Sequence, residues 1–595
     1  MGRGQVAARV AGRSLTRRSR RVVIKARLVN LRRAGLKSTV SHISYLKRDG
    51  VTREGAPGQA YGPIDDDADT LDFEQRGRDD RHQFRFIVAP EDAEDIGELR
   101  TFTRQLMDQM ERDLGTKLEW IAVDHWDTDN PHTHVILRGK DDSGENLVIA
   151  PEYIAGGMQA RARELATEWL GVRTELEIRE SLTREVTQER WTSLDSQIAR
   201  YLEGDSINLA AIGPGRDGIE RSLILGRLQH LRTMGLAEQA AGDTWRIDPS
   251  SEQALRTLGE RGDIVRLMQR AMGREQRELR VFDHRQSTPI AGRIADKGLI
   301  DELSDRSYIV IDGSDGRAYY ARLATGVDIA DLPIGGMVEL RGIGEPRRVD
   351  KSIAAMAIDG VYRTQFARER LSAKLPTVRN PASVIDAQVR RLEALRRGGI
   401  VERLGDGVWR VPPDLAERGM RYDQDRLAGV QPAICSHLPI ERQIRALGAT
   451  WLDEQILRES QSRSSTGFGA EVSRAVEGRK MFLVEQGLAE RQGQRVMVAR
   501  NLLAILRTRE MTSAARTIEA EMGLVYRPIA DDSRVTGIYR RSLLLASGRF
   551  AMLDDSVGFS LVPWRPVIES RLGQSVSAIV RGPTVSWDIG RGPSR

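Results

Sequence analysis

Alternating apolar and polar positions predict a sheet-containing domain in the first 190 residues. Four runs have the alternation or the short apolar stretch typical of strands: 21–29, 81–89, 118–124 and 132–138. Residues 91–114 carry apolar side chains at helical spacing, a short helix is expected at 41–50, and 151–190 is amphipathic. The stretch 50–80 is rich in Gly, Pro and Asp and is expected to be a loop.

The rest of the chain repeats a unit made of a helix, a glycine and two short strands. Residues 227–247 match 391–411 without a gap, and 483–498 form a weaker third copy. A glycine ends the helix of each copy: Gly235, Gly399 and Gly487. The pattern is typical of the last helix and wing of a winged helix-turn-helix module. Because such modules bind DNA or mediate protein contacts, both roles stay open.

Two further segments, 288–345 and 526–590, are rich in strands and glycine, as in small β-barrels or half-barrels. The expected fold class is therefore α+β: an N-terminal antiparallel sheet with helices, then winged-helix-like repeats and small β-barrel-like segments. In chain order we expect a basic flexible leader (1–20), a sheet domain (21–190) and a winged-helix-like module (191–285). These are followed by a small β domain (286–350), a second winged-helix-like module (351–425), a helical region with the third unit (426–525), and a C-terminal β domain with a basic tail (526–595).

Charge distribution points to a nucleic-acid partner. Residues 1–37 of the 595-residue chain hold twelve Arg or Lys and no acid, a block that attracts phosphates. The leader residues expected to contact DNA are Arg17, Arg18, Arg20 and Arg21. A solvated tail is the alternative, and the two are compatible because such tails commonly order on DNA. No run of eighteen apolar residues is present, so we expect no membrane span and a cytoplasmic protein.

Three histidines are spaced to meet at one point. His132 and His134 are two apart on a predicted strand and so project from one face, and a turn through Pro131 can bring His125 alongside them. They are three of only eight histidines, and the single cysteine excludes a cysteine cluster. Three imidazoles suit softer divalent ions better than Mg²⁺ by ligand preference alone, and leave coordination positions open for substrate. Asp127 could accept the second N–H of a ligand histidine, although surface turns also collect Asp.

The block His125-x-Asp127-x-x-x-Pro-His132-x-His134, with a tyrosine far upstream, resembles the metal motif of plasmid mobilisation relaxases and T-DNA border endonucleases. Over 21–190 this resemblance implies a five-stranded antiparallel sheet with the three histidines as metal ligands on its central strands. It implies Tyr45 as the nucleophile, because His42-Ile-Ser-Tyr45-Leu-Lys-Arg-Asp-Gly50 looks like the family's first motif. Residues 191–595 look like the long C-terminal region of one relaxase subgroup.

The activity implied is the nicking of one strand at an origin of transfer with Mg²⁺ or Mn²⁺, giving a 5′-phosphotyrosyl DNA and a free 3′-hydroxyl. Lys47 and Arg48 would favour the phenolate of Tyr45 and contact DNA. The implied partners are single-stranded plasmid DNA, relaxosome accessory proteins and a type IV secretion coupling protein, with export to a recipient cell as the DNA adduct. Without the resemblance, Tyr61 and Tyr153 compete closely with Tyr45.

Two other classes of protein stay open. A three-histidine metallohydrolase would activate water and form no covalent intermediate, and Tyr45→Phe separates it from a relaxase. A DNA-binding accessory or regulatory protein would use the winged-helix repeats without cleaving, and metal-dependent cleavage would exclude it.

Overall fold

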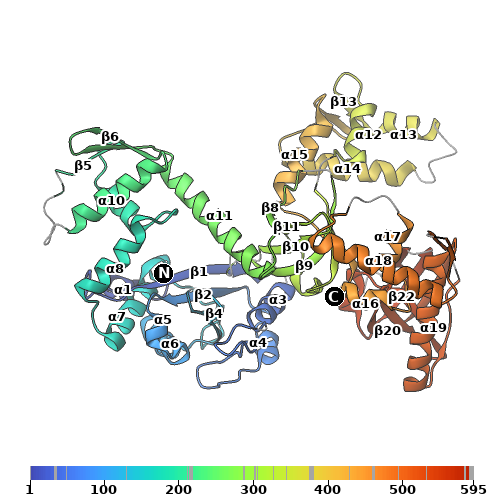
Figure 1. The fold of residues 1–595 in the computed structure, drawn as a ribbon, viewed down its shortest axis with the longest axis horizontal. Helices are drawn as coiled ribbons and strands as arrows, with labels where there is room; N and C mark the ends of the chain where they lie inside the picture. Colours follow the sequence, from blue (N-terminus) through green and yellow to red (C-terminus); the bar gives the residue numbers. More distant parts are fainter. Residues whose placement is uncertain are drawn as a thin grey trace. The chain divides into compact units, whose positions relative to one another are not determined.

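The computed structural model describes residues 2–31, 36–48, 50–128, 130–210, 212, 219–285, 288–300, 303, 306–325, 327–342, 345–373, 381–427, 429–458, 463–493, 495–530, 532–581 and 584–588. The protein is a mixture of helix and sheet, consistent with the expected α+β class (Figure 1). It divides into two compact units, unit 1 with Met1–Leu267 and Leu299–Asp305, and unit 2 with Met268–Gly298 and Arg306–Arg595. The expected basic tail lies outside the described residues from position 589 on.

A four-stranded antiparallel sheet forms the centre of the first part of unit 1. Its spatial order is β1 (Val22–Asn30), β2 (His82–Pro90), β4 (His132–Arg138) and β3 (Trp120–His125). The four predicted strands are thus confirmed to within two residues. The resemblance implied five strands; the described residues form four, and a single antiparallel bridge from Tyr61 to Ala122 extends the sheet at the β3 edge.

Helices pack on both faces of this sheet. On one face, α6 (Leu99–Leu114), η1 (Tyr153–Gly157) and α7 (Met158–Leu170) share a core with Phe84, Phe86 and Val135. On the other, α3 (Leu36–Leu46) and α4 (Thr70–Arg76) pack with Ile121, Val123 and Ile136. The two faces of the sheet are therefore buried under different helices, and the histidines belong to the face covered by α3 and α4.

Three predicted boundaries are wrong for local reasons. The expected loop 50–80 contains α4, which Asp69 caps by accepting from the backbone N–H groups of Leu71 and Asp72. The expected helix 91–114 is two helices, α5 (Ala93–Ile96) and α6, separated at Gly97 with φ 70°. The helix expected over 151–190 is likewise broken at Gly171, φ 74°, before α8 (Glu175–Val186).

Residues 2–20, expected as a flexible leader, are placed against the sheet domain. They include α1 (Gln5–Val10), and the backbone of Arg3 exchanges hydrogen bonds with Val148 and Ala150. The Arg3 guanidinium donates to Asp141 at 2.9 Å. In the structure this segment is held by contacts to residues more than 130 positions away in the chain.

All three repeat copies have the predicted order of helix, glycine and hairpin. The elements are α10 (Ile219–Thr233), β6 (Ala237–Ala241) and β7 (Thr244–Ile247); α14 (Pro381–Arg397), β14 (Glu402–Gly405) and β15 (Val408–Arg410); and α18 (Gly467–Glu485), β17 (Ala489–Gln492) and β18 (Arg495–Val498). Gly235, Gly399 and Gly487 have φ of 73°, 69° and 66°, the left-handed conformation of a helix C′ residue. In the first two copies β5 (Ser206–Asn208) and β13 (Val361–Arg363) add a third strand.

A buried arginine–aspartate pair recurs in each copy. The pairs join the repeat helix to a preceding helix, α9 (Ser193–Arg200), α12 (Arg348–Met356) or α17 (Trp451–Leu457): Arg227 with Asp195, Arg391 with Asp350, and Arg479 with Asp453. In the first and third copies the guanidinium also donates to four backbone carbonyls of the segment before that helix. The copies therefore share a buried ion pair between two helices as well as the order of their elements.

Two six-stranded sheets complete unit 2. The first has the order β16 (Ala433–Ser436), β12 (Met337–Leu340), β9 (Ile290–Leu299), β10 (Ser307–Gly313), β11 (Arg317–Arg322) and β8 (Glu278–Val281). The second has the order β19 (Val525–Tyr526), β22 (Gly558–Pro563), β21 (Gly548–Asp554), β20 (Ser533–Leu545), β23 (Ser575–Arg581) and β24 (Thr584–Asp588), with α19 (Leu502–Met522) against it. The remaining helices are α11 (Ser251–Met272), η2 (Ile329–Asp331), α13 (Thr364–Ala373), α15 (Leu415–Leu427), α16 (Ile440–Ile444) and η3 (Pro566–Arg571). Across the described ranges, no helix is both long enough and apolar enough to span a bilayer.

Candidate metal centre

The three histidines predicted as ligands meet at one end of the central strands. His125 ends β3 and is paired directly with His132, which begins β4, while His134 is paired with Val123. Directly paired residues of antiparallel strands point to the same face, so all three rings lie on one side of the sheet. Their centroids are 5.5 Å (His125 to His132), 4.5 Å (His125 to His134) and 4.9 Å (His132 to His134) apart. One nitrogen from each ring lies within 4.8 Å of the other two, so the three histidines could hold a metal ion.

Backbone carbonyls orient two of the rings. Nε2 of His125 lies 2.9 Å from the carbonyl oxygen of Leu46, and Nδ1 of His132 lies 2.9 Å from that of Asn130. Each carbonyl accepts an N–H and so leaves the other ring nitrogen with its lone pair. For His132 that nitrogen is Nε2, which faces Nε2 of His134 at 3.1 Å. All three side chains are buried, with exposed fractions of 0% (His125), 6% (His132) and 2% (His134). Buried imidazoles that face one point are a donor set that fits a divalent transition-metal ion.

A buried hydrogen-bond network supports the two strands from the opposite face. Oδ1 of Asp124 accepts from the Tyr61 hydroxyl at 2.8 Å and from the Thr133 hydroxyl at 2.7 Å. Burial raises the pKa of Asp124, and burial together with this carboxylate raises the pKa of Tyr61 well above its usual value. Because Thr133 lies between the candidate ligands His132 and His134, its anchorage fixes the segment that carries them.

The location of the three candidate tyrosines separates them. Tyr61 is fully buried against the Asp124 network, and Tyr153 is buried and donates to Asp113 at 2.9 Å, both in the core of the face opposite the histidines. Tyr45 is half-buried on α3 and packs against the core cluster of the histidine face, which includes Val123. The structure thus brings Tyr45, and not its two competitors, to the side of the sheet that carries the candidate ligands.

Two contacts join the Tyr45 helix to the histidine hairpin. The carbonyl of Leu46, the next residue after Tyr45, is the one that binds His125. The Arg48 guanidinium lies over the Tyr45 ring, 4.3 Å from its centroid, and pairs with Asp127 at 3.2 Å. Asp127 therefore contacts a cation beside the tyrosine, while the carbonyls of Leu46 and Asn130 are the acceptors seen at two of the three histidines.

The cations predicted to contact DNA have different surroundings. Arg18 pairs with Glu175, and Arg20 is buried and pairs with Glu177 and Asp92. Arg17 is exposed, and Arg21, Lys47 and Arg48 are half-exposed. The guanidinium groups of Arg18 and Arg20 are thus engaged within unit 1, where they hold the leader segment to α8.

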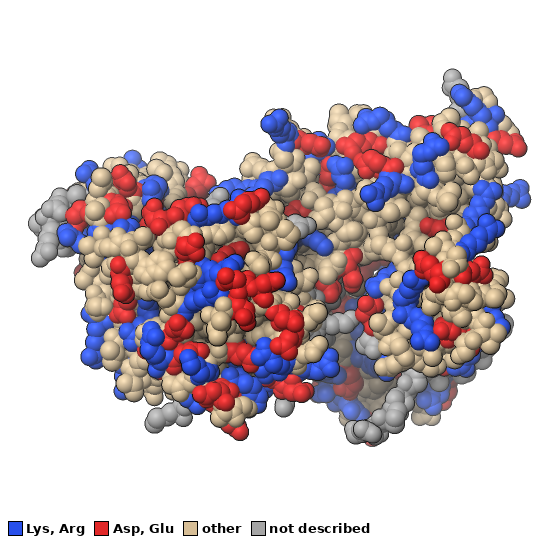
Figure 2. All heavy atoms as spheres, turned by 90° about the horizontal axis from the view of Figure 1, so that it is seen from below, with Lys and Arg blue, Asp and Glu red and all other residues tan. Residues whose placement is uncertain are grey.

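Sequence reasoning missed two cations on the histidine face. The strand register pairs Lys25 with Ile87, which is itself paired with His134, and pairs Arg27 with Arg85. Lys25 and Arg27 are exposed on β1 and form no ion pair within the part of the chain that the structure describes. The alternation of basic residues along 21–29 was the signal, but their face becomes clear only from the register. On the face of the molecule that Figure 2 shows, basic and acidic side chains are interspersed.

The fold and site define a protein with a candidate three-histidine metal centre on an antiparallel sheet. The chain belongs to a family described as proteins of unknown function (DUF3363), whose family model matches residues 224–595. No curated protein and no solved structure matches the chain. The matched residues begin after the histidine-bearing sheet, so the family describes the repeats and the β domains, and the metal centre must be judged on its own geometry.

Proposed function

We propose that this protein is a DNA relaxase, an enzyme that nicks one strand at an origin of transfer by transesterification and stays joined to it through Tyr45. The observation that carries the proposal is the shared face: Tyr45 lies on the side of the sheet occupied by the three buried histidines, and its helix is bound to their hairpin at two points. In this proposal the sheet domain is the nicking domain, followed by winged-helix-like modules and small β domains.

The chemistry assigned to Tyr45 is attack of its phenol oxygen on the scissile phosphorus. A phosphorus–oxygen bond to tyrosine forms as the bond to the 3′ oxygen breaks, the phenol proton passes to solvent, and the released 3′ oxygen takes up a proton. A phenol is a poor nucleophile at neutral pH, and the Arg48 guanidinium over the ring favours its phenolate form. A divalent ion such as Mg²⁺ or Mn²⁺ held by His125, His132 and His134 would polarise the scissile phosphate and neutralise developing charge.

Positive charge on the same face of the sheet supports single-stranded DNA as the substrate. Lys25 lies two strands from His134 on one row of the sheet, a separation of roughly 10 Å. Lys25 and Arg27 would contact phosphates that flank the scissile one. The resemblance of the motif extends the proposal to plasmid DNA, relaxosome accessory proteins and a type IV secretion coupling protein as partners, with a cytoplasmic enzyme exported as its DNA adduct.

The deciding experiment is a denaturing gel of the full chain with labelled single-stranded DNA from the intergenic region beside its gene. With Mn²⁺ or Mg²⁺ the wild type is expected to give a covalent protein–DNA band that Tyr45→Phe abolishes. Tyr526→Phe, which removes a half-buried hydroxyl in unit 2, is the matched control and should keep the band. Cleavage retained in Tyr45→Phe without any band would instead identify a metallohydrolase, and DNA binding without metal-dependent cleavage an accessory protein.

A further inference from the structure

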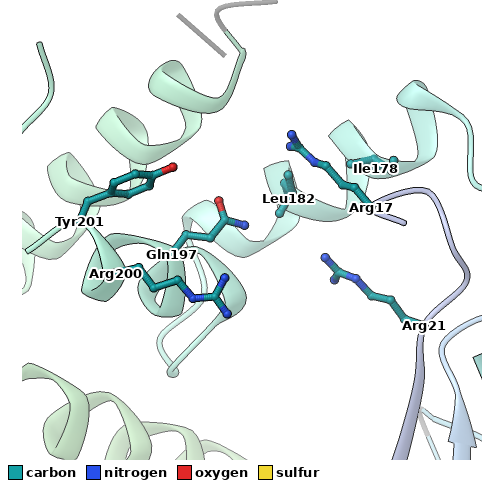
Figure 3. A pocket seen from close by; sticks show the side chains of 7 residues that line it. All are labelled: Arg17, Arg21, Ile178, Leu182, Gln197, Arg200 and Tyr201. Atoms are coloured by element: carbon teal, nitrogen blue, oxygen red, sulfur yellow. The ribbon is translucent and has the colours of Figure 1, made fainter. Parts of the chain in front are cut away.

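A pocket lined by three arginines lies in unit 1, and none of the three histidines lines it (Figure 3). Its volume is about 360 Å³, within the range of small-molecule sites. The lining residues come from the segment before β1, from α8 and from the end of α9: Arg17, Arg21, Ile178, Leu182, Gln197, Arg200 and Tyr201. Figure 3 shows Arg17 and Arg21 extending toward the helices, with Gln197, Arg200 and Tyr201 directed into the same space.

The lining combines the two chemistries that a nucleotide needs. Three of the seven lining residues are arginines and none is acidic, a composition that suits a phosphate because each planar guanidinium can donate two parallel hydrogen bonds. Tyr201 is 45% exposed, and the buried side chains of Ile178 and Leu182 form the apolar part of the lining. An exposed aromatic ring beside arginines is the usual platform for an unstacked base.

The two acids that pair with Arg21 are not in direct hydrogen-bond contact with it. Glu91 and Glu185 lie 3.8 Å and 3.5 Å from nitrogens of Arg21, longer than direct hydrogen bonds. The Glu185 carboxylate is itself bound to Ser193 and to the backbone N–H of Leu194. Arg200 has no ion pair within the described residues.

The pocket adjoins the end of the sheet that carries the histidines. Arg21 directly precedes Val22, which is paired with Pro90 at the end of β2, and this is the end at which β3 stops at His125 and β4 starts at His132. Two to three strand spacings separate these positions, roughly 10–15 Å. A single-stranded DNA whose scissile phosphate lies at the histidines can therefore place a neighbouring, uncleaved nucleotide in the pocket.

We infer that this pocket binds one nucleotide of the DNA strand, with its phosphate on Arg17, Arg21 and Arg200, its base against Tyr201 and the Gln197 amide at the base edge. The inference rests on the proposed function, since the strand is that enzyme's substrate. The pocket holds a flanking nucleotide and takes no part in bond cleavage.

Fluorescence anisotropy of the full chain with labelled dT₁₂ in EDTA tests binding without cleavage. Arg17→Ala/Arg200→Ala is expected to raise Kd at least tenfold and to reduce the log–log salt slope by about 0.7 for each phosphate that the variant no longer neutralises. Tyr201→Ala is expected to raise Kd at least about fivefold. The control is Arg13→Ala, an exposed arginine of the same segment outside the pocket.

Photo-crosslinking identifies the contact directly. An oligonucleotide with 5-iodouracil is expected to crosslink to Tyr201, and free dTMP is expected to compete far more weakly than the strand. An equal reduction of affinity in Arg13→Ala and the pocket variants would overturn the inference, as would dTMP binding that pocket variants abolish without any effect on the strand. If the wild type forms the Tyr45 adduct and the pocket variants bind DNA with normal affinity, the pocket inference is wrong and the relaxase proposal stands. If DNA binding depends on the pocket but no adduct forms, the pocket inference stands and the relaxase proposal is wrong.

Discussion

Nη2 of Arg48 lies 3.2 Å from Oδ2 of Asp127 while the same guanidinium covers the ring of Tyr45, with 4.3 Å from its carbon to the ring centroid. The histidine hairpin thus contributes a carboxylate that positions a cation, and the cation contacts the proposed nucleophile. With the hydrogen bond from His125 to the Leu46 carbonyl, this makes the orientation of Tyr45 depend on the hairpin that carries the three histidines.

Asp127→Asn is expected to slow adduct formation about tenfold, the effect of removing one charged hydrogen bond worth roughly 1.5 kcal/mol. Metal affinity should stay unchanged, because the carbonyls that orient His125 and His132 remain. Single-turnover gel assays and metal titration measure the two quantities. The role that the sequence motif suggested, in which Asp127 orients a ligand histidine, requires instead a loss of metal affinity of about 10–100-fold. Asp67→Asn, at an exposed loop position, is the control.

Replacement of His134 by alanine is expected to abolish metal-dependent stabilisation and the DNA adduct together. In the wild type, Mn²⁺ at about a hundred times its Kd should stabilise the folded protein by about 2.7 kcal/mol, and the variant should show no such gain. Thermal unfolding with and without Mn²⁺, and metal content by mass spectrometry, measure this. His284→Ala, in unit 2, should behave as wild type. Equal Mn²⁺ stabilisation in His134→Ala would place the metal elsewhere.

The strands and the histidine cluster were predictable because both depend on short-range pattern. Alternation indicated β2, β3 and β4, and the two-residue spacing of His132 and His134 with a turn at Pro131 indicated their common face with His125. The repeat copies were equally clear, since Gly235 and its counterparts end each helix at the same position.

The rest depends on contacts between distant residues. Arg20 pairs with Glu177 across 157 positions, and nothing near Arg20 in the sequence shows that it is buried. The sequence alone leaves Tyr61 as a possible nucleophile. Its backbone bridge to Ala122 and its hydrogen bond to Asp124 place its ring on the face of the sheet opposite the histidines. The face occupied by Lys25 follows from strand register, which periodicity alone does not give.

Charge reversal at the β1 edge, Lys25→Glu/Arg27→Glu, is expected to weaken single-strand binding and to reduce the log–log salt slope by about 0.7 for each phosphate that is no longer neutralised. Both side chains are exposed, so folding and metal content should not change. Anisotropy titrations at several salt concentrations give the slope. Arg112→Glu, exposed on α6 over the opposite face, changes charge by the same sign and should leave the slope almost intact. Equal slopes for the two variants would remove β1 from the DNA surface.

Acid should loosen the contact between the leader and α8 in a defined pH window. Hydrogen bonds from the Thr174 backbone N–H and hydroxyl, with the Arg20 guanidinium, lower the pKa of Glu177 to about 2. A lowered folded-state pKa gives stability that is present above the ordinary value, near 4.5, and is lost as pH falls toward 2. Glu177→Gln should therefore flatten the loss of stability over that window.

The measurement is the urea midpoint of the first unfolding transition, followed from neutral pH down to about pH 2.5, which covers most of the interval between the ordinary pKa of Glu177 and its lowered value. Glu180→Gln removes an exposed carboxylate from the same helix and should keep the wild-type profile. An identical acid profile in Glu177→Gln and the wild type would show that this capping box contributes nothing to acid sensitivity.

The buried pair of Arg479 and Asp453 should dominate the stability of the third repeat copy. Both side chains are fully buried, and the guanidinium also donates to the carbonyls of residues 443, 444, 446 and 448. Arg479→Ala leaves an uncompensated carboxylate and open carbonyls in the core, so about 3–5 kcal/mol should be lost. Hydrogen–deuterium exchange of the α18 amides measures the loss locally. Arg445→Ala breaks an exposed pair with Glu485, a residue of the same helix, and should lower the stability by less than about 1 kcal/mol. Similar losses of stability in the two variants would mean that the recurring buried pair does not stabilise this copy more than a surface pair does.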